Sequence, residues 1–187
     1  MGRFSNFFYQ VSSGWVTLIG LVTFLLFTIL VLPGQSTSSQ AEIDNADSPD
    51  MSFYYSAETL YEMAEVYGDS GRAAYIRARF TFDLIWPLVY TFFLTTSLSW
   101  ILNRSGVFEN LWRQLNLLPF FGMIFDYLEN ISTSLVMYRF PEYTIIIDSL
   151  AGVFTLLKWM LIGASFLLLV FGAFSAIWSW SRSAREK

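Results

Sequence analysis

The sequence predicts an all-α, polytopic membrane protein, an antiparallel bundle of four transmembrane helices with one amphipathic helix outside the membrane. Of its 187 residues, 55% are hydrophobic and only 14% are charged, whereas charged residues make up roughly 25% of soluble domains. The apolar residues also gather in long blocks, which a soluble core does not require. We therefore treat residues 1–187 as a single transmembrane domain.

The first two predicted spans cover residues 15–32 and 79–102. A signal peptide is the competing interpretation of the first span. We favour an uncleaved anchor, because the apolar run exceeds the roughly 7–15 residues of a signal-peptide core. The second span contains Pro87, which neighbouring helices can accommodate in a membrane, so it predicts a kink rather than a helix end.

The last two predicted spans cover residues 117–138 and 153–178. Pro119 falls in the first turn of the third span, where a proline is tolerated. The apolar region over residues 145–180 is too long for one span of about 20 residues. We expect Gly152 to break it into a short interfacial segment and the fourth span.

An extracytoplasmic loop is predicted over residues 34–75, with a polar tether over 34–50 and an amphipathic helix over about 57–67. Ser56 can cap this helix, and Gly68 is expected to end it. Its apolar residues recur at helical spacing: Leu60, Met63, Ala64 and Tyr67. The helix either packs against the bundle or the membrane interface, or forms a lid over an outward-facing cavity.

The distribution of basic residues predicts that both termini are cytoplasmic. One side of the membrane would carry Arg3, Arg104, Arg113, Arg182, Arg185 and Lys187. The other side would carry Arg72, Arg77, Arg79 and Arg139, beside the acidic residues of the first loop. The expected surroundings are therefore a lipid bilayer that the chain crosses several times.

The composition excludes several classes of function. There is no cysteine and no histidine, so disulfides, cysteine nucleophiles and the commonest zinc or haem ligands are ruled out. The net charge is −4, and without a basic patch we expect no nucleic-acid partner. No nucleotide-binding, metalloprotease or hydrolase motif is present, and no cofactor is evident.

Ionisable residues inside the predicted spans locate a candidate site. A charge in the hydrocarbon costs about 2.5–3.5 kcal/mol on insertion scales, so it is normally kept for a reason. Asp126, Glu129, Asn130 and Thr133 recur at positions i, i+3, i+4 and i+7, which puts them on one helix face. We expect this face to line one outward-facing acidic cavity together with residues of the other spans: Asp83, Tyr90 and Lys158, with Arg79 and Arg77 at its mouth.

Three functions remain open for this site. The preferred hypothesis is that it binds, and possibly passes, a cation or small ligand, with Asp126, Glu129 and Asp83 as ligands of a Ca²⁺ or Mg²⁺ ion. In the second, the charges are purely structural ties in an accessory or assembly subunit of a larger membrane complex. In the third, an intramembrane enzyme acts on a lipid or lipid-linked substrate. Asp126 or Glu129 would then be the general acid or base, and the phosphate of the substrate would be held by Lys158, Arg79 and Arg77. We favour a protein without enzymatic activity, and transport would require a homo-oligomer.

The segments Phe82-Asp83-…-Pro87 and Asp126-Tyr127-Leu128-Glu129-Asn130 resemble a pattern in small bacterial integral membrane proteins with four helices. The resemblance covers roughly residues 79–163. It implies a protein of the bacterial inner membrane, and it implies no activity, cofactor or catalytic residue.

Overall fold

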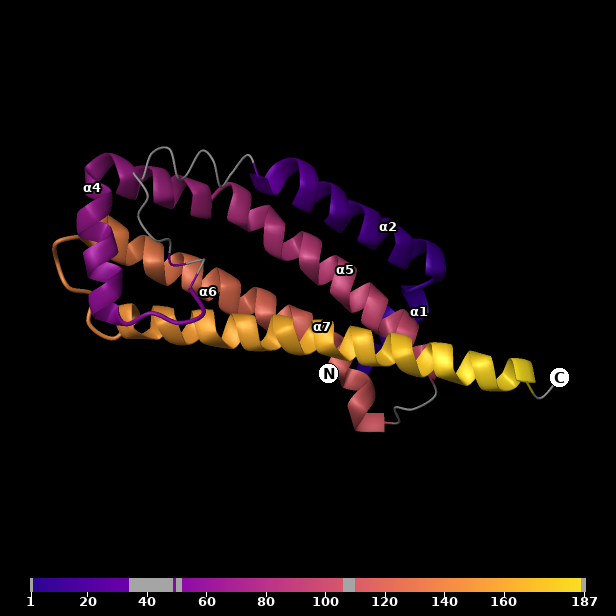
Figure 1. Ribbon diagram of the computed structural model, residues 1–187. Helices are drawn as coiled ribbons and strands as arrows, with labels where there is room; N and C mark the ends of the chain where they lie inside the picture. The colour runs from indigo at the N-terminus through magenta and orange to yellow at the C-terminus, as the bar shows by residue number, and fades with distance from the viewer. Residues whose placement is uncertain (1, 34–48, 50–51, 106–109, 186–187) are drawn as a thin grey trace.

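The computed structural model describes the backbone of residues 2–33, 49, 52–105 and 110–185, and these residues form helices and no strand. The long helices α2 (Gly14–Leu26), α5 (Phe82–Ser105), α6 (Leu118–Arg139) and α7 (Ile147–Arg185) lie side by side, and consecutive members run in opposite directions (Figure 1). The shorter elements are α1 (Gly2–Val11), the π-helical turn η1 (Phe27–Val31), α4 (Ala57–Arg79) and the 3-10 helix η3 (Asn110–Leu117). The all-α prediction is confirmed.

Within the described residues, three helical stretches are long and apolar enough to cross a membrane: Gly14–Val31, Ala57–Arg104 and Ile147–Trp178. The third predicted span, residues 117–138, is the helix α6, which begins at Leu118 with Pro119 in its first turn and ends at Arg139. It is less apolar than the other long helices because it contains polar residues such as Asp126 and Glu129. These polar residues gather on one buried face.

The prediction that Gly152 breaks the last helix is wrong. Gly152 lies inside α7, which is one helix of 39 residues. Its length is about 58 Å at the helical rise of 1.5 Å per residue. A Cβ atom at Gly152 would lie 2.0 Å from the carbonyl oxygen of Tyr55. The glycine therefore allows another segment to approach the helix closely instead of ending the helix.

The amphipathic helix after Ser56 is present, and its cap is confirmed, since the Ser56 hydroxyl accepts a hydrogen bond from the Thr59 amide at 3.1 Å. Gly68, at φ 60° and ψ −176°, turns the chain sharply there. This conformation is essentially restricted to glycine. A second helical arm, not predicted, then runs on to Arg79. The polar tether predicted over 34–50 lies outside the described residues except for Pro49.

The first arm of α4, residues 57–67, packs across one end of α6 and α7 (Figure 1). Its buried residues form an apolar cluster with Val136 and Met137 of α6 and Ala151 of α7. From α4 and the residue just before its cap, this cluster contains Tyr55, Leu60, Met63, Ala64, Tyr67 and Tyr75. Packing against the bundle is thus confirmed, whereas movement of this arm as a lid stays a prediction.

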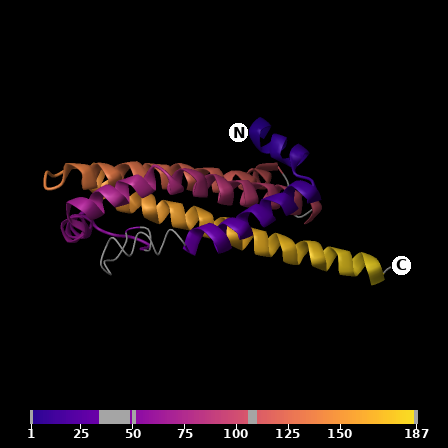
Figure 2. The ribbon, with the colours of Figure 1, turned by 90° about the horizontal axis from the view of Figure 1, so that it is seen from above.

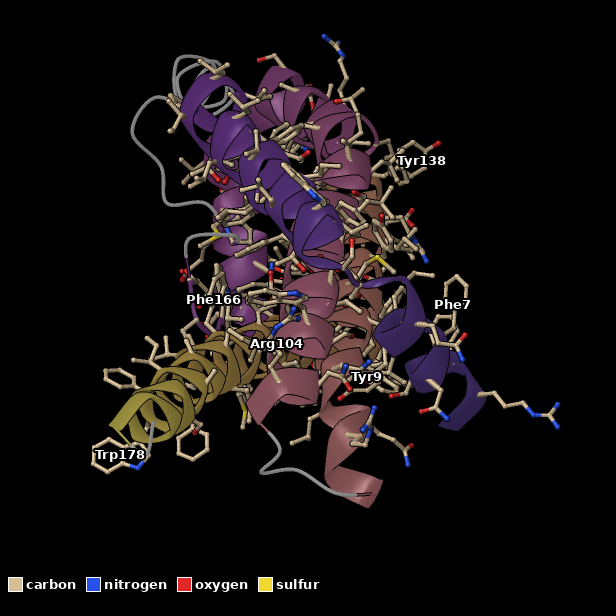
Figure 3. All side chains as sticks on the ribbon, turned by 90° about the vertical axis from the view of Figure 1, so that its right-hand side faces the viewer. Phe7, Tyr9, Arg104, Tyr138, Phe166 and Trp178 are labelled. Carbon is tan, nitrogen blue, oxygen red and sulfur yellow. The ribbon has the colours of Figure 1, made fainter. Side chains whose placement is uncertain are left out.

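The bundle buries many polar side chains beside its apolar clusters, and it exposes large apolar side chains. Hydroxyl side chains of α5, α6 and α7 are almost completely buried: Thr95, Thr96, Ser99, Thr133, Thr155 and Ser165. Large apolar side chains are instead exposed along α2 and α7. Figure 3 shows Phe7, Tyr138 and Trp178 pointing away from the bundle, and their exposed fractions are 53%, 79% and 65%. Water-soluble monomers rarely expose so much contiguous apolar surface.

Candidate functional site

The polar face of α6 points into the bundle, as predicted from its spacing. Glu129 and Thr133 have no exposed surface, and Asp126 and Asn130 are 7% and 4% exposed. The reason lies in the sequence. The neighbouring residues on the opposite side of the helix, Ile124, Leu128 and Ile131, are apolar and face the outside of the bundle. A helix with one polar stripe buries that stripe when its other faces meet apolar surroundings.

Lys158 of α7 contacts both carboxylates of α6. Its Nζ atom lies 2.5 Å from Oε2 of Glu129 and 3.7 Å from Oδ1 of Asp126. Lys158 is 5% exposed, so all three charged groups lie in the interior. The ammonium group is closer to Glu129, which makes Glu129 and Lys158 the primary ion pair and Asp126 the secondary contact.

Two further side chains from the predicted site bind Asp126. The Tyr90 hydroxyl of α5 donates a hydrogen bond to Oδ2 at 2.9 Å. Nδ2 of Asn130, one turn along α6, lies 3.5 Å from Oδ1. Side chains of α5, α6 and α7 therefore meet at the carboxyl group of Asp126. We call Asp126, Glu129 and Lys158, with Tyr90, Asn130 and Tyr55, the charge network.

Tyr55 was not predicted as a site residue. Its hydroxyl lies 3.4 Å from Oε1 of Glu129 and donates a hydrogen bond to it, while its carbonyl faces Gly152. One sequence signal was present, since an apolar residue directly before a helix cap commonly packs against the fourth residue of that helix. Here these are Tyr55 and Leu60, which share a core cluster. That signal predicts packing, but it gives no indication of Glu129.

Asp83 does not join the two carboxylates of α6 in a metal site. It forms an ion pair with Arg79, with Nη1 and Oδ2 3.0 Å apart, across the junction of α4 and α5. The Arg79 guanidinium also stacks over the Tyr75 ring at 4.5 Å. Among the described residues no three acidic side chains are grouped so that they could hold a metal ion. Arg77, expected at the mouth of the same cavity, is exposed at the surface.

The geometry changes two of the chemical expectations. Lys158 already occupies the position between Asp126 and Glu129 that a Ca²⁺ or Mg²⁺ ion would need, so these residues do not fit a divalent metal. The enzymatic hypothesis required Lys158, Arg79 and Arg77 to hold a phosphate, but Lys158 and Arg79 are engaged by carboxylates, and Arg77 is exposed at the surface. The remaining distinctive feature is charge, since two carboxyls share one ammonium group.

A line of buried hydroxyls leads from the charge network along α5. Thr91, Thr95 and Ser99 recur every four residues after Tyr90 and so share one face of α5. The Thr91 hydroxyl donates to the carbonyl of Pro119 at 3.3 Å, and the Ser99 hydroxyl accepts from Asn116 at 2.9 Å. Between them, the buried Thr95 hydroxyl has no hydrogen-bond partner within the described part of the chain. The interior of the bundle is therefore polar well beyond the charged groups.

No model of a known protein family matches the sequence, and comparisons with curated proteins and with solved structures give no significant match either. The resemblance to small bacterial membrane proteins therefore gains no support from these comparisons. What the chain does has to be argued from the charge network and from the surface that surrounds it.

Proposed function

We propose that the chain is an integral membrane protein whose spans are α2 with η1, α5, α6 and α7. The inverted distribution of polar and apolar side chains supports this proposal, because polar groups in membrane proteins face the bundle interior. α6 is less apolar than the other proposed spans, and the polar residues that make it so lie on its buried face. A helix lying between α5 and α7 meets those helices through that face and the lipid through the opposite one.

The orientation follows from charge. The end of the bundle that holds α1, the last turn of α5 and η3 carries Arg3, Arg104 and Arg113. The C-terminal sequence adds Arg182, Arg185 and Lys187, which makes six basic residues against four at the opposite end, Arg72, Arg77, Arg79 and Arg139. The opposite end also carries the acidic residues of α4, among them Glu58, Glu62 and Glu65. Basic residues are retained on the cytoplasmic side, so both termini would be cytoplasmic. The resemblance drawn from the sequence favours the bacterial inner membrane.

The proposed activity is the binding of a cation, in the form of a proton, within the charge network. With both carboxyls ionised, the network carries one more negative charge than positive. A proton is the one cation that restores neutrality without displacing Lys158. Glu129, at 2.5 Å from the ammonium group, forms the ion pair, and Asp126 holds the proton.

The surroundings of Asn130 support the assignment of the proton to Asp126. Its Oδ1 atom is buried and accepts no hydrogen bond within the described part of the chain, although buried acceptors are nearly always paired. The oxygen and nitrogen of an amide exchange places when the group turns by 180°, and their assignment depends on hydrogen bonding. Turned in this way, the oxygen of Asn130 faces Asp126 and accepts a hydrogen bond from the protonated carboxyl.

Access to the network would be controlled by the first arm of α4. Tyr55, just before that arm, contacts Glu129 directly, and Gly68 provides a turn about which residues 57–67 can swing. This retains the lid hypothesis and the outward-facing direction of the predicted cavity. Passage of the proton would need a second exit, for which the buried hydroxyls of Thr91, Thr95 and Ser99 lie in the appropriate direction.

Infrared spectroscopy tests the proposal, because the C=O stretch of a protonated carboxyl is resolved from that of carboxylates. Wild-type protein at neutral pH should show this band, and Asp126→Asn should abolish it. Asp83→Asn is the matched control, since Asp83 has its own ion pair with Arg79 and its loss should leave the band unchanged. A wild-type spectrum without the band would refute the proposal. Ca²⁺ and Mg²⁺ should leave thermal stability unaltered.

A structural role in a larger assembly is the second candidate. The last part of α7 extends past the ends of α5 and α6 (Figure 1) and exposes Phe174, Ile177 and Trp178. In this case the charge network would only tie helices together. Asp126→Asn would then reduce stability without changing the spectrum in the carboxyl region.

A further inference from the structure

The N-terminal helix α1 is fixed to the basic end of the bundle by a buried amide. Asn116 of η3 has no exposed surface. Its Oδ1 accepts from the Ser5 hydroxyl at 2.7 Å, and its Nδ2 donates to the Ser99 hydroxyl at 2.9 Å. Figure 2 shows α1 projecting to one side at the end of the bundle, next to the end of α5. α1 therefore lies across the bundle, in the direction expected of a helix in the membrane interface.

Two arginines beside α1 are held against aromatic rings. The Arg104 guanidinium lies 4.3 Å from the centre of the Trp100 ring, and that of Arg113 lies 4.1 Å from the centre of the Tyr9 ring. Nη2 of Arg113 also lies 3.5 Å from Oδ1 of Asn103, on the same turn of α5 as Arg104. Arg104 and Tyr9 can be followed in Figure 3 at this end of the molecule. Stacking occupies the faces of the two guanidinium groups and leaves N–H groups at their edges for a ligand.

The positive charge at this end is not neutralised by described neighbours. The described residues of α1, of the last two turns of α5 and of η3 include no aspartate or glutamate, and Glu109 lies outside the described residues. Burial raises the pKa of the Tyr9 phenol, and the nearby Arg113 acts in the opposite direction more weakly. Tyr9 is therefore neutral at physiological pH and adds no negative charge beside Arg113.

Exposed apolar side chains of α1 and of the start of α2 lie at the same end of the bundle as these arginines, since α1 contacts both α5 and η3. Phe4, Phe7 and Trp15 are 50%, 53% and 77% exposed. Phe4 also packs edge-on against Phe120 of α6, with ring centroids 5.3 Å apart. A free phosphate ion would use only the arginines. A phospholipid would use both parts of this surface, the guanidinium groups for its phosphate and the phenyl and indole rings for its acyl chains.

We propose that Arg104 and Arg113, together with the exposed apolar face of α1, form a binding site for the headgroup of an anionic phospholipid. This inference rests on the proposed membrane location and not on proton binding. The lipid would hold α1 in the interface and so stabilise η3 and the start of α6. Each arginine near an anionic surface contributes about 5-fold to binding, so the pair should contribute about 25-fold.

The test is a lipid titration of the detergent-solubilised full-length protein, read from its melting temperature. Dioleoylphosphatidylglycerol should stabilise wild type at lower concentrations than dioleoylphosphatidylcholine does. The double variant Arg104→Gln/Arg113→Gln should lose most of this preference. Arg77→Gln is the matched control, an exposed arginine on α4 at the opposite end, and it should keep the preference. Inorganic phosphate alone should not stabilise the protein.

Three results would overturn the proposal: equal stabilisation by the two lipids, an unchanged preference in the double variant, or full stabilisation by phosphate alone. The hydrogen bonds that fix α1 are retained in the double variant, because Ser5 and Tyr9 bond to the backbone carbonyl of Arg113, and only the stacking of the Arg113 guanidinium on the Tyr9 ring is lost. The infrared band assigned to Asp126 does not depend on these arginines. The two proposals can therefore fail separately.

Discussion

The ion pair between Lys158 and Glu129 permits the sharpest prediction, which concerns Lys158→Met. The substitution keeps a flexible chain of similar length and removes the ammonium group. At 2.5 Å, and with an effective dielectric constant of about 20, the attraction between the two charges is roughly 6–7 kcal/mol. Most of that energy offsets the cost of burying them. Removing one partner of a buried pair typically costs about 3–5 kcal/mol, because the other charge is left uncompensated.

The double variant Lys158→Met/Glu129→Gln separates the pair from its surroundings. Glutamine keeps a carbonyl oxygen that can accept from Tyr55, and no charge is left opposite the missing lysine. We expect the double variant to lie within about 2 kcal/mol of wild type, since replacing a whole buried pair is often close to neutral. Since removing either partner alone costs about 3–5 kcal/mol, the coupling energy between the two positions should be at least about 4 kcal/mol.

The free energy of unfolding can be measured in mixed micelles by circular dichroism as the fraction of SDS rises. Thr155→Val is the matched control, because Thr155 is equally buried, lies one turn from Lys158, and donates only to the carbonyl of Ala151 at 3.0 Å. It should cost less than about 1 kcal/mol. If the single losses at Lys158 and Glu129 add up to the loss in the double variant, the two residues do not interact and the charge network is wrong.

Three more substitutions, one of them with a matched control, test how the ends of the bundle are held. Gly152→Ala should destabilise by about 1–3 kcal/mol through overpacking against Tyr55, and hydrogen exchange in residues 53–67 should increase. Gly163→Ala, with no atom within 4 Å of the new methyl group, should be neutral or slightly stabilising. Gly68→Ala should cost about 1–3 kcal/mol from backbone strain alone, measured by thermal unfolding, and an unchanged melting temperature would count against the sharp turn. Asn116→Ala should cost about 1–3 kcal/mol and make α1 susceptible to proteolysis, which intact protection would contradict.

The parts of the structure that depend on local periodicity could be predicted from the sequence. The third span was placed within one residue of α6, and its polar face was correctly turned to the interior, because spacing of three and four residues defines a helix face. The cap at Ser56 was found for the same reason, since capping is a local interaction. α1 was missed because its ten residues are too few and too aromatic to stand out beside the longer apolar blocks.

The parts that depend on contacts between distant segments could not be predicted. Gly152 has the same local appearance whether it ends a helix or admits the backbone of Tyr55, and only the fold decides between them. Asp83 was expected to line one cavity with Glu129, whereas its ion-pair partner, Arg79, is four residues away. The i, i+4 spacing of these two charges is visible in the sequence and favours such a pair.

The charge network and the segment that leads into the first arm of α4 are in direct contact, which in the proposed function would link protonation to access. Tyr55 bonds Glu129 through its hydroxyl and meets Gly152 through its carbonyl, so the arm cannot leave without exposing the ion pair on one side. Displacement of Tyr55 would remove a donor from Glu129 and admit water to Lys158, and water weakens the attraction between the charges. A weaker pair leaves Lys158 free to turn toward Asp126 and stabilise its ionised form, so that the Asp126 carboxyl would release its proton to the admitted water. Opening of the arm and release of the proton are thus favoured by the same event, as an outward-facing proton site requires.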